Sequence, residues 1–186
     1  MKTWKDIDGL TPDADIEAYQ ALAEKVPDGS TIVEVGCYHG KSLASLADII
    51  KRKNLRPVAV DLWDAGQFNF QPEMRGFFKD MLLQFKSNMA DVGLSPVVFC
   101  GVSASAAQII EDNSLGMAYI DADHSYEWCK KDIEVWWPKV NPGGILAGHD
   151  YGNENIGVQK AVDEFVAARG LKLERNNGWV WWVIKP

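Results

Sequence analysis

Apolar residues along this chain follow two alternating spacings. Runs of β-branched and aliphatic residues predict short buried strands, and segments with an apolar residue every three or four positions predict amphipathic helices. The first spacing predicts strands at residues 31–35, 56–61, 96–101, 115–123, 144–150, 171–174 and 179–184. The second predicts helices at 13–25, directly after residue 40, and at 75–90, 103–110, 126–137 and 158–166.

Turn and capping residues mark several of the predicted boundaries. We expect Thr11 to cap the first helix, with Pro12 at its first position, and Ser103 to cap the short helix that it begins. The NPGG sequence at residues 141–144 is typical of a turn. The Asn177-Gly178 dipeptide is the strongest short-range signal for a hairpin between the last two strands.

The alternation of strand and helix favours an α/β fold with a doubly wound, mostly parallel sheet and helices on both of its faces. The terminal hairpin would add an antiparallel strand at or near the edge. The length of 186 residues favours one domain over residues 1–186, with an N-terminal helical segment at 1–28. Ligands of such folds bind beyond the carboxyl ends of the strands, so the residues that end each strand are the candidate site residues.

Composition excludes several classes of partner. The net charge of −7 would repel nucleic acid and anionic membranes. No run reaches the roughly 18 consecutive apolar residues that span a bilayer, and the start MKTWKDIDGLTPD lacks the apolar core of a secretory signal. The three cysteines lack metal-type spacing and are expected as free thiols. We therefore expect a cytoplasmic protein that binds neither nucleic acid nor membrane.

The segment EVGCYHGKS, residues 34–42, runs from the first predicted strand into a helix. Gly36 allows a tight turn, and Gly40 allows backbone to approach a ligand and the helix to pack closely. The G-x-x-x-G spacing differs from the dinucleotide pattern G-x-G-x-x-G, and the segment also lacks the upstream glycine of a P-loop. The alternative is a tight strand-to-helix turn with no ligand.

Two carboxylates indicate what this loop would hold. Glu34, near the end of the first strand, would repel a pyrophosphate but attract an ammonium group. Asp61 ends the second strand, where a carboxylate can bind both hydroxyls of a ribose. A ligand with a ribose, an amino group and no phosphate meets both demands, and S-adenosylmethionine is such a ligand.

Four blocks, IVEVGCYHGKS, VAVDLWD, AYIDADHSYE and NPGGILAGHDY, resemble the class I S-adenosylmethionine-dependent methyltransferases over nearly the whole chain. The last two blocks are similar to small O-methyltransferases related to those of bacterial sugars and antibiotics. The resemblance implies a Rossmann-like seven-stranded sheet with strand order 3-2-1-4-5-7-6 and strand 7 antiparallel. The cofactor-binding residues that it implies are Glu34, Gly36, Cys37, Tyr38, Gly40, Ser42, Asp61, Leu62, Ser103 and Asp121.

Acids and histidines end the fourth and fifth predicted strands, and two functional readings stay open for them. In the first, Asp121 and Asp150 with His149 bind Mg²⁺, which would lower the pKa of an acceptor hydroxyl. Histidine is a poorer Mg²⁺ ligand than a carboxylate, so a softer divalent metal is an alternative. In the second there is no metal, and His124 or His149 is the general base, with Asp121 near the reacting methyl group.

Asp123 has a structural alternative, because an acid after a strand often caps the next helix. The aromatic and glycine-rich residues 62–80 are the candidate lid or acceptor wall, and residues 151–157 the opposite rim. We expect methylation of a small hydroxylated acceptor such as a sugar or secondary metabolite, with a homo-oligomer left open. The alternatives are a nicotinamide-dependent oxidoreductase and a non-catalytic S-adenosylmethionine-binding module.

Overall fold

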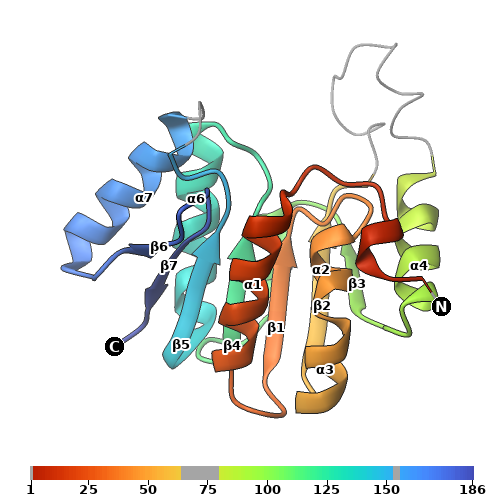
Figure 1. Cartoon of the computed structure of the whole chain (residues 1–186). Coiled ribbons are helices and arrows are strands. Elements are labelled where there is room, and N and C mark those ends of the chain that lie inside the picture. The colour runs from red at the N-terminus through yellow and green to blue at the C-terminus, as the bar shows by residue number, and fades with distance from the viewer. Residues whose placement is uncertain (1, 64–79, 153–155) are drawn as a thin grey trace.

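The computed structural model describes residues 2–63, 80–152 and 156–186. Its sheet has seven strands in the order β3-β2-β1-β4-β5-β7-β6 (Figure 1). The strands are β1 (Thr31–Val35), β2 (Arg56–Asp61), β3 (Val97–Cys100), β4 (Leu115–Ile120), β5 (Val140–Gly148), β6 (Glu174–Arg175) and β7 (Trp181–Ile184). Strand β7 runs antiparallel to both β5 and β6, and the other neighbours pair in parallel. The predicted fold and strand order are therefore confirmed.

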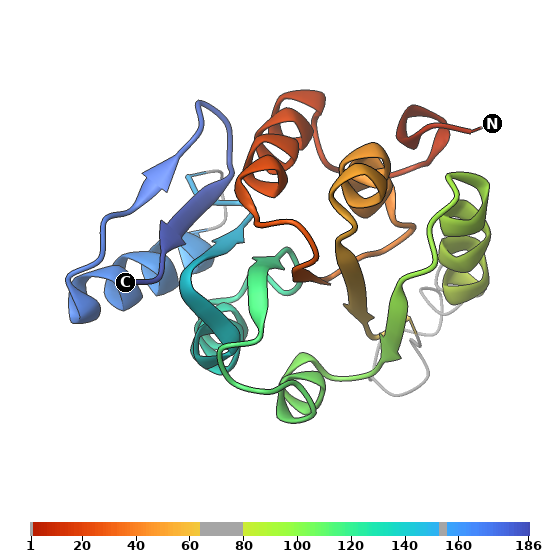
Figure 2. The same ribbon diagram turned by 90° about the horizontal axis from the view of Figure 1, so that it is seen from below.

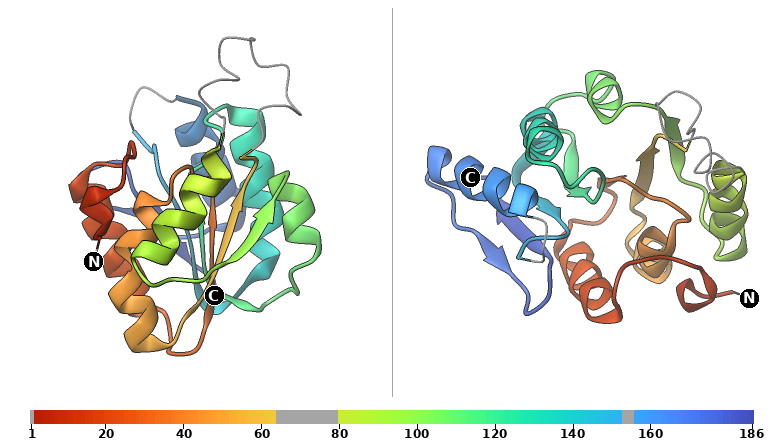
Figure 3. Two further views of the ribbon diagram at one scale, coloured as in Figure 1. Left: turned by 90° about the vertical axis from the view of Figure 1, so that its right-hand side faces the viewer. Right: turned by 90° about the horizontal axis from the view of Figure 1, so that it is seen from above.

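Helices cover both faces of the sheet (Figures 2 and 3). One face carries the short turn η1 (Trp4–Asp6) and helices α1 (Asp13–Lys25), α2 (Lys41–Ser45), α3 (Ala47–Lys53) and α4 (Met81–Asp91). The other carries α5 (Ser103–Gln108), α6 (Tyr126–Trp136), the turn η4 (Trp137–Lys139) and α7 (Ile156–Arg169). Each face has its own buried apolar cluster, because β1, β2, β4 and β5 send alternate side chains to opposite sides.

Both predicted helix caps are wrong. Helix α1 begins at Asp13, and Pro12 itself is the N-cap residue, so Thr11 lies one position too early. The carbonyl oxygen of Pro12 accepts hydrogen bonds from the backbone N–H groups of Asp15 and Ile16. Ser103 is the first residue of α5 and not its cap. Its hydroxyl oxygen instead accepts a 2.8 Å hydrogen bond from the Trp136 indole.

The predicted turn at residues 141–144 is also wrong, because β5 runs through it without interruption. The register explains how: Leu115 pairs with Val140 and Met117 with Ile145, so the single β4 residue Gly116 faces the four residues 141–144. The extra residues form an irregularity within the strand pair. The hairpin prediction is confirmed, since β6 pairs with β7. Its connection is the five-residue segment 176–180, which contains the Asn177-Gly178 dipeptide and is longer than a two-residue turn.

Several predicted boundaries differ from the observed ones. The helix after Gly40 is divided into α2 and α3 at Leu46, and β6 shares only Glu174 with the strand predicted at 171–174. The fourth strand ends at Ile120, so its acids lie beyond the sheet. The start of the helix predicted at 75–90 falls partly outside the described residues. No helix in the described ranges is both long enough and apolar enough to span a bilayer.

The carboxyl ends of β1 and β4 touch at Gly36. This residue has a φ of +88°, and an added Cβ would lie 2.0 Å from the carbonyl oxygen of Asp121. The backbone N–H of Asp121 donates to the carbonyl oxygen of Val35 at 2.8 Å. Only glycine allows both the positive φ and this close approach, so the contact decides how the polar residues after β4 are presented.

We predict that Gly36→Ala destabilises the protein by about 2–5 kcal/mol. The variant combines a left-handed backbone cost of about 1–2 kcal/mol with the displacement of packed backbone, which costs a further 1–3 kcal/mol. Gly143→Ala is the matched control, because Gly143 has a φ of +77° but no atom within 4 Å of an added Cβ. Urea denaturation of both variants measures the difference, and equal losses would contradict the role of the Gly36–Asp121 contact.

Candidate functional site

Two adjoining cavities lie beyond the carboxyl ends of the strands. The first, of about 420 Å³, is lined by Asp61, Leu62, Ser103, Trp128, Asp132 and their neighbours, and we call it the β2-side cavity. The second, of about 370 Å³, is lined by Thr11, Lys41, His124, His149, Asp150, Trp179 and their neighbours, and we call it the β5-side cavity. Gly36, Tyr38, Asp121 and Ala122 line both, so the turn after β1 is the boundary between them.

The turn after β1 is held by the end of β2. Tyr38, at a φ of 48°, donates its backbone N–H to Asp61 Oδ2 at 2.7 Å. The Trp63 N–H donates to Asp61 Oδ1 at 3.1 Å, and the Trp63 indole donates to the Tyr38 carbonyl oxygen at 2.8 Å. Asp61 therefore fixes the loop and also lines the β2-side cavity. Each carboxylate oxygen has a second lone pair that can accept a ligand hydroxyl.

Gly40 serves helix packing. Its φ is +86°, and an added Cβ would lie 2.5 Å from the Met89 side chain and 2.9 Å from Phe85. Both of these residues are on α4. The predicted close packing of the helix is thus explained by α4, and a contact of Gly40 with a ligand stays a prediction.

Glu34 lies beneath the turn and is fully buried. Its carboxylate accepts hydrogen bonds from the Ser42 hydroxyl at 2.5 Å and from the Tyr19 hydroxyl at 3.0 Å. Burial raises the pKa of Glu34 to about 8, although both hydrogen bonds favour the ionised form. Glu34 lines neither cavity, whereas Ser42 and Cys37 line the β5-side cavity. Its direct contact with a ligand ammonium stays a prediction.

Ser103 lies on the wall of the β2-side cavity and is held by α6. Besides its bond from Trp136, it hydrogen-bonds Asp132, whose pKa is raised to about 6 by burial. Asp132 and the partly exposed Trp128 sit one helical turn apart on α6 and also line this cavity. Sequence reasoning missed both, although their spacing of four residues is typical of two side chains on one helix face.

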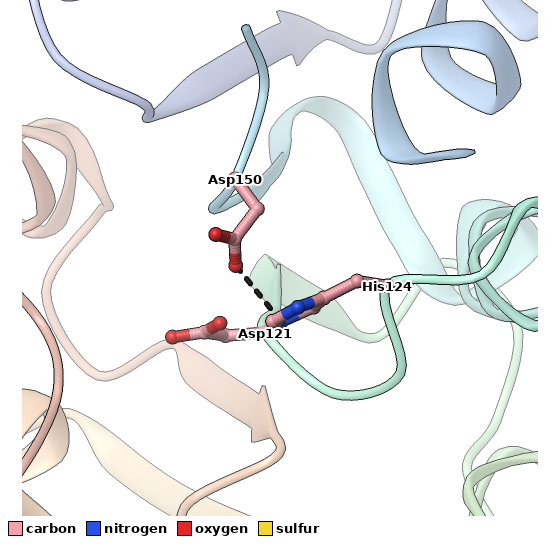
Figure 4. Close-up of side chains that lie close together, drawn as sticks. All are labelled: Asp121, His124 and Asp150. Atoms are coloured by element: carbon pink, nitrogen blue, oxygen red, sulfur yellow. Dashed lines mark ion pairs between the residues drawn. The ribbon is translucent and has the colours of Figure 1, made fainter. Parts of the chain in front are cut away.

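Asp121, His124, His149 and Asp150 converge at the ends of β4 and β5, as predicted. Asp150 Oδ2 lies 2.9 Å from His124 Nε2 and 3.2 Å from His149 Nδ1 (Figure 4 shows the first of these). Asp121 Oδ1 lies 3.8 Å from His149 Nδ1. His149 is buried, whereas the His124 side chain is 43% exposed at the β5-side cavity.

The proximity of these groups shifts their pKa values. Burial disfavours a charged His149, but hydrogen bonds to Asp150 and Asp15 and the charge of Asp121 raise its pKa to about 9. Burial favours a neutral Asp150, yet its hydrogen bonds with His124 and His149 hold its pKa well below the usual range. The hydrogen bond with Asp150 raises the pKa of His124. Burial raises the pKa of Asp121 to about 6, against the opposing charge of His149.

Among the described residues, the group suited to a metal ion is Asp121, His124 and Asp150. Their nearest ligand atoms all lie within 4.8 Å of one another. This grouping contains His124 where the sequence predicted His149. Both ring nitrogens of His149 already face carboxylates, with Nε2 at 3.2 Å from Asp15 Oδ2. An imidazolium held in this way has no lone pair for a metal.

Asp123 takes part in the start of α6. Its carboxylate accepts a 2.8 Å hydrogen bond from the backbone N–H of Ser125, the N-cap residue. Asp123 therefore has a structural role in this turn, but it is not the N-cap residue that the structural alternative expected, and it also lines the β2-side cavity. Most of the candidate lid at 62–80, and residues 153–155 of the predicted opposite rim, lie outside the described residues.

A comparison with protein families gives one match. The model of a family described as a methyltransferase domain matches residues 33–151 of this chain. The interval contains the turn after β1, Asp61 and the group from Asp121 to Asp150. The interval thus covers the ends of β1, β2, β4 and β5 that line the two cavities. The lining residues outside it are Gly9, Leu10, Thr11 and Trp179.

Solved structures of similar fold include methyltransferases. The O-methyltransferase NovP has a TM-score of 0.72 at 18% identity, with 92% of this chain and 79% of that chain covered. SMU.1697c from Streptococcus mutans, solved in complex with SAH, has a TM-score of 0.66 at 12% identity, with 95% of this chain and 100% of that chain covered. At such identities the likeness is one of fold.

A curated relative, the uncharacterized protein y4gI of Sinorhizobium fredii, is 28% identical over 123 residues. The match covers 64% of this chain, and the chain spans 13% of the length of that relative.

We predict that Glu34→Gln removes a pH dependence of stability. The folded-state pKa of about 8 exceeds the ordinary value of 4.5, so the folded protein holds a proton that the unfolded chain releases. The free energy of unfolding of the parent should therefore fall relative to that of the variant by up to about 1.4 kcal/mol per pH unit between about pH 5 and 8. Urea denaturation across this range measures it. Parallel pH profiles of parent and variant would contradict the protonated, buried state of Glu34.

Proposed function

The chain belongs to the methyltransferase-domain family, and from this premise we propose that it transfers a methyl group from S-adenosylmethionine to an oxygen of a small hydroxylated acceptor. The observation that carries the proposal is the position of Asp61, whose carboxylate both holds the turn after β1 and lines the β2-side cavity. The oxygen acceptor is supported by the likeness to NovP, an O-methyltransferase.

The charge of the β2-side cavity fits a nucleoside without phosphate. Four of the described residues that line it are aspartates: Asp61, Asp121, Asp123 and Asp132. No lysine, arginine or histidine is among the described residues that line this cavity. Such a wall would repel the pyrophosphate of a nicotinamide dinucleotide, which argues against the oxidoreductase alternative. A ribose would meet Asp61, and the adenine would face Ser103 and the α6 residues Trp128 and Asp132.

The rest of the cofactor would cross the boundary at Gly36 and Tyr38 toward the β5-side cavity. The sulfonium of the bound cofactor supplies a methyl group on a good leaving group. The chain has to align the acceptor oxygen with this methyl group and remove its proton. Alignment alone can contribute several kcal/mol, of the order of 7–11 in the best intramolecular cases.

His124 is the proposed proton acceptor. Its half-exposed imidazole lies on the β5-side cavity, and its Nε2 is 2.9 Å from Asp150 Oδ2. When the ring takes the acceptor proton, Asp150 stabilises the imidazolium that forms. Asp121, at the boundary of both cavities, would orient the acceptor hydroxyl beside the methyl group.

A divalent metal would use the same residues. Asp121, His124 and Asp150 offer two carboxylates and an imidazole, a set that suits a softer ion than Mg²⁺. Such an ion would lower the pKa of the acceptor hydroxyl. The short contact between His124 and Asp150 favours the metal-free assignment, because the Asp150 carboxylate already has His124 Nε2 as a hydrogen-bond partner.

We expect the intact chain to bind S-adenosylhomocysteine with micromolar affinity, about −8 kcal/mol, and Asp61→Ala to weaken binding 10- to 100-fold. The variant removes a charged acceptor from the ribose hydroxyls. Asp48→Ala is the matched control, because Asp48 is an exposed aspartate in the first turn of α3. Isothermal calorimetry gives the affinities. An intact chain that binds neither S-adenosylmethionine nor its demethylated product would reject the proposed function.

We expect methyl transfer to survive chelation but not the loss of His124. Incubation with labelled S-adenosylmethionine and a panel of hydroxyl compounds should give a labelled product, and EDTA should leave the rate unchanged. His124→Gln should lower the rate by about 10²–10⁴-fold, as expected on removal of a general base. Loss of activity with EDTA and recovery with a divalent metal would contradict the metal-free assignment. A chain that binds the cofactor but labels no compound would support the non-catalytic alternative.

A further inference from the structure

Asp15 is a buried acid that lies outside both cavities. It is the third residue of α1 and only 2% exposed. Its Oδ2 lies 3.2 Å from His149 Nε2. Its Oδ1 accepts hydrogen bonds from the Asn176 side-chain amide at 2.8 Å and from the backbone N–H of Trp179 at 3.0 Å. One carboxylate thus joins α1, the end of β5 and the hairpin between β6 and β7.

From Asp15, acidic and basic groups alternate as far as the β5-side cavity. His149 lies between Asp15 and Asp150, at 3.2 Å from a carboxylate oxygen of each. Asp150 in turn lies 2.9 Å from His124. Each imidazole in this series is oriented by the carboxylate before it, so the ring of His124 depends on a residue three partners away.

The hairpin segment 176–180 is shaped around the same carboxylate. The Asn176 side-chain oxygen accepts from the backbone N–H groups of Gly178 and Val180, both at 3.0 Å. An added Cβ on Gly178 would lie 2.0 Å from Asp15 Oδ1, so a larger residue cannot approach Asp15 in this way. The segment places Trp179 on the β5-side cavity, with its ring edge-on to His149 at a centroid distance of 5.8 Å.

We propose that Asp15 is a positioning residue of the acceptor side of the site, which fixes with one carboxylate both the His149–Asp150–His124 series and the Trp179 wall. The inference rests on the proposed function, since it assigns the acceptor to the β5-side cavity. The partly exposed indole of Trp179 then offers a flat apolar surface to the ring of an acceptor, in the same cavity as the polar groups of His124 and Asp150.

Charge explains why an aspartate is needed at this position. His149 is buried and lies near Asp15, Asp121 and Asp150. An asparagine at position 15 could still accept hydrogen bonds from the hairpin through its oxygen, but its NH₂ would face the donor on His149 Nε2. Two opposed donors in a buried place cannot both be satisfied, so the His149 ring would have to move or give up its Nε2 proton.

Nuclear magnetic resonance of the histidine rings tests the inference without a known acceptor. The chain has three histidines, so ¹⁵N-histidine labelling gives a simple spectrum, in which His39 is an internal reference. We expect Asp15→Asn to shift the ring signals of both His149 and His124 and to leave those of His39 in place. Asp13→Asn, which removes an exposed carboxylate from the same helical turn, should move none of them. A shift confined to His149 would overturn the inference.

Gly178→Ala is a second variant that leaves every charge in place. By pushing the hairpin away from Asp15, the variant should shift the Trp179 indole signal and the ring signals of His149 and His124. An unmoved Trp179 signal in a folded variant would contradict the proposal that Asp15 positions both the histidines and Trp179.

The affinity of Asp15→Asn for S-adenosylhomocysteine should stay within about twofold of that of the parent, while its kcat for the acceptor should fall at least about tenfold. Absent binding by the parent would reject the proposed function alone, whereas a large affinity loss confined to Asp15→Asn would reject the positioning role.

Discussion

The close contact between the ends of β1 and β4 is the constraint on which the rest of the site depends. The backbone of Gly36 lies so close to Asp121 that no side chain fits between them. Tyr38, two residues later, is then held by Asp61 from β2. Hydrogen bonds thus join the carboxyl ends of the three parallel strands β1, β2 and β4. The space beyond these strand ends is divided into the β2-side cavity and the β5-side cavity. The division matters because the two cavities have different chemistry, one walled by aspartates and the other by paired acids and histidines.

The acids around these cavities have partners that offset their partial or full loss of water. Backbone N–H groups hold Asp61, hydroxyls hold Glu34, and histidines hold Asp150. The partners have different effects: hydrogen bonds from His124 and His149 lower the pKa of Asp150, whereas burial prevails at Glu34 and raises it. Carboxylates that are alike in sequence therefore differ in charge at neutral pH. Asp150 is the one best suited to stabilise a cation on the ring beside it.

The positions of residues relative to the predicted strands were sufficient to predict which of them meet at one edge of a parallel sheet. The carboxyl ends of β1, β2, β4 and β5 meet at one edge of the sheet, so Gly36, Asp61, Asp121 and His124 could be expected together from their positions after apolar runs. The strand order came from the family resemblance, whereas the terminal hairpin had already predicted an antiparallel strand at or near the edge. The predicted cap at Thr11 was wrong, because a helix can start with its first N–H groups bonded to a backbone carbonyl alone. The predicted turn at 141–144 was wrong, because pairing with an antiparallel neighbour can keep an irregular segment within a strand.

Sequence reasoning could not find Asp15, nor decide between the two histidines. Asp15 is 134 residues from His149, and the helical pattern around it says which face is apolar but not which acid of the first turn faces inward. The same limit applies to His124 and His149, which both follow strands and differ only in what packs against them. Both line the β5-side cavity, but His149 is buried among Asp15, Asp121 and Asp150, whereas the His124 side chain is half-exposed. Only the three-dimensional arrangement distinguishes His149, an imidazolium held between carboxylates, from His124, the half-exposed candidate base.

A crystal structure of the chain with S-adenosylhomocysteine bound would test the central claim most directly. The account predicts electron density for a ribose whose hydroxyls lie within hydrogen-bond distance of Asp61, with the sulfur near the Gly36–Asp121 contact and facing the β5-side cavity. Density for the nucleoside in the β5-side cavity, or a ribose out of reach of Asp61, would contradict it.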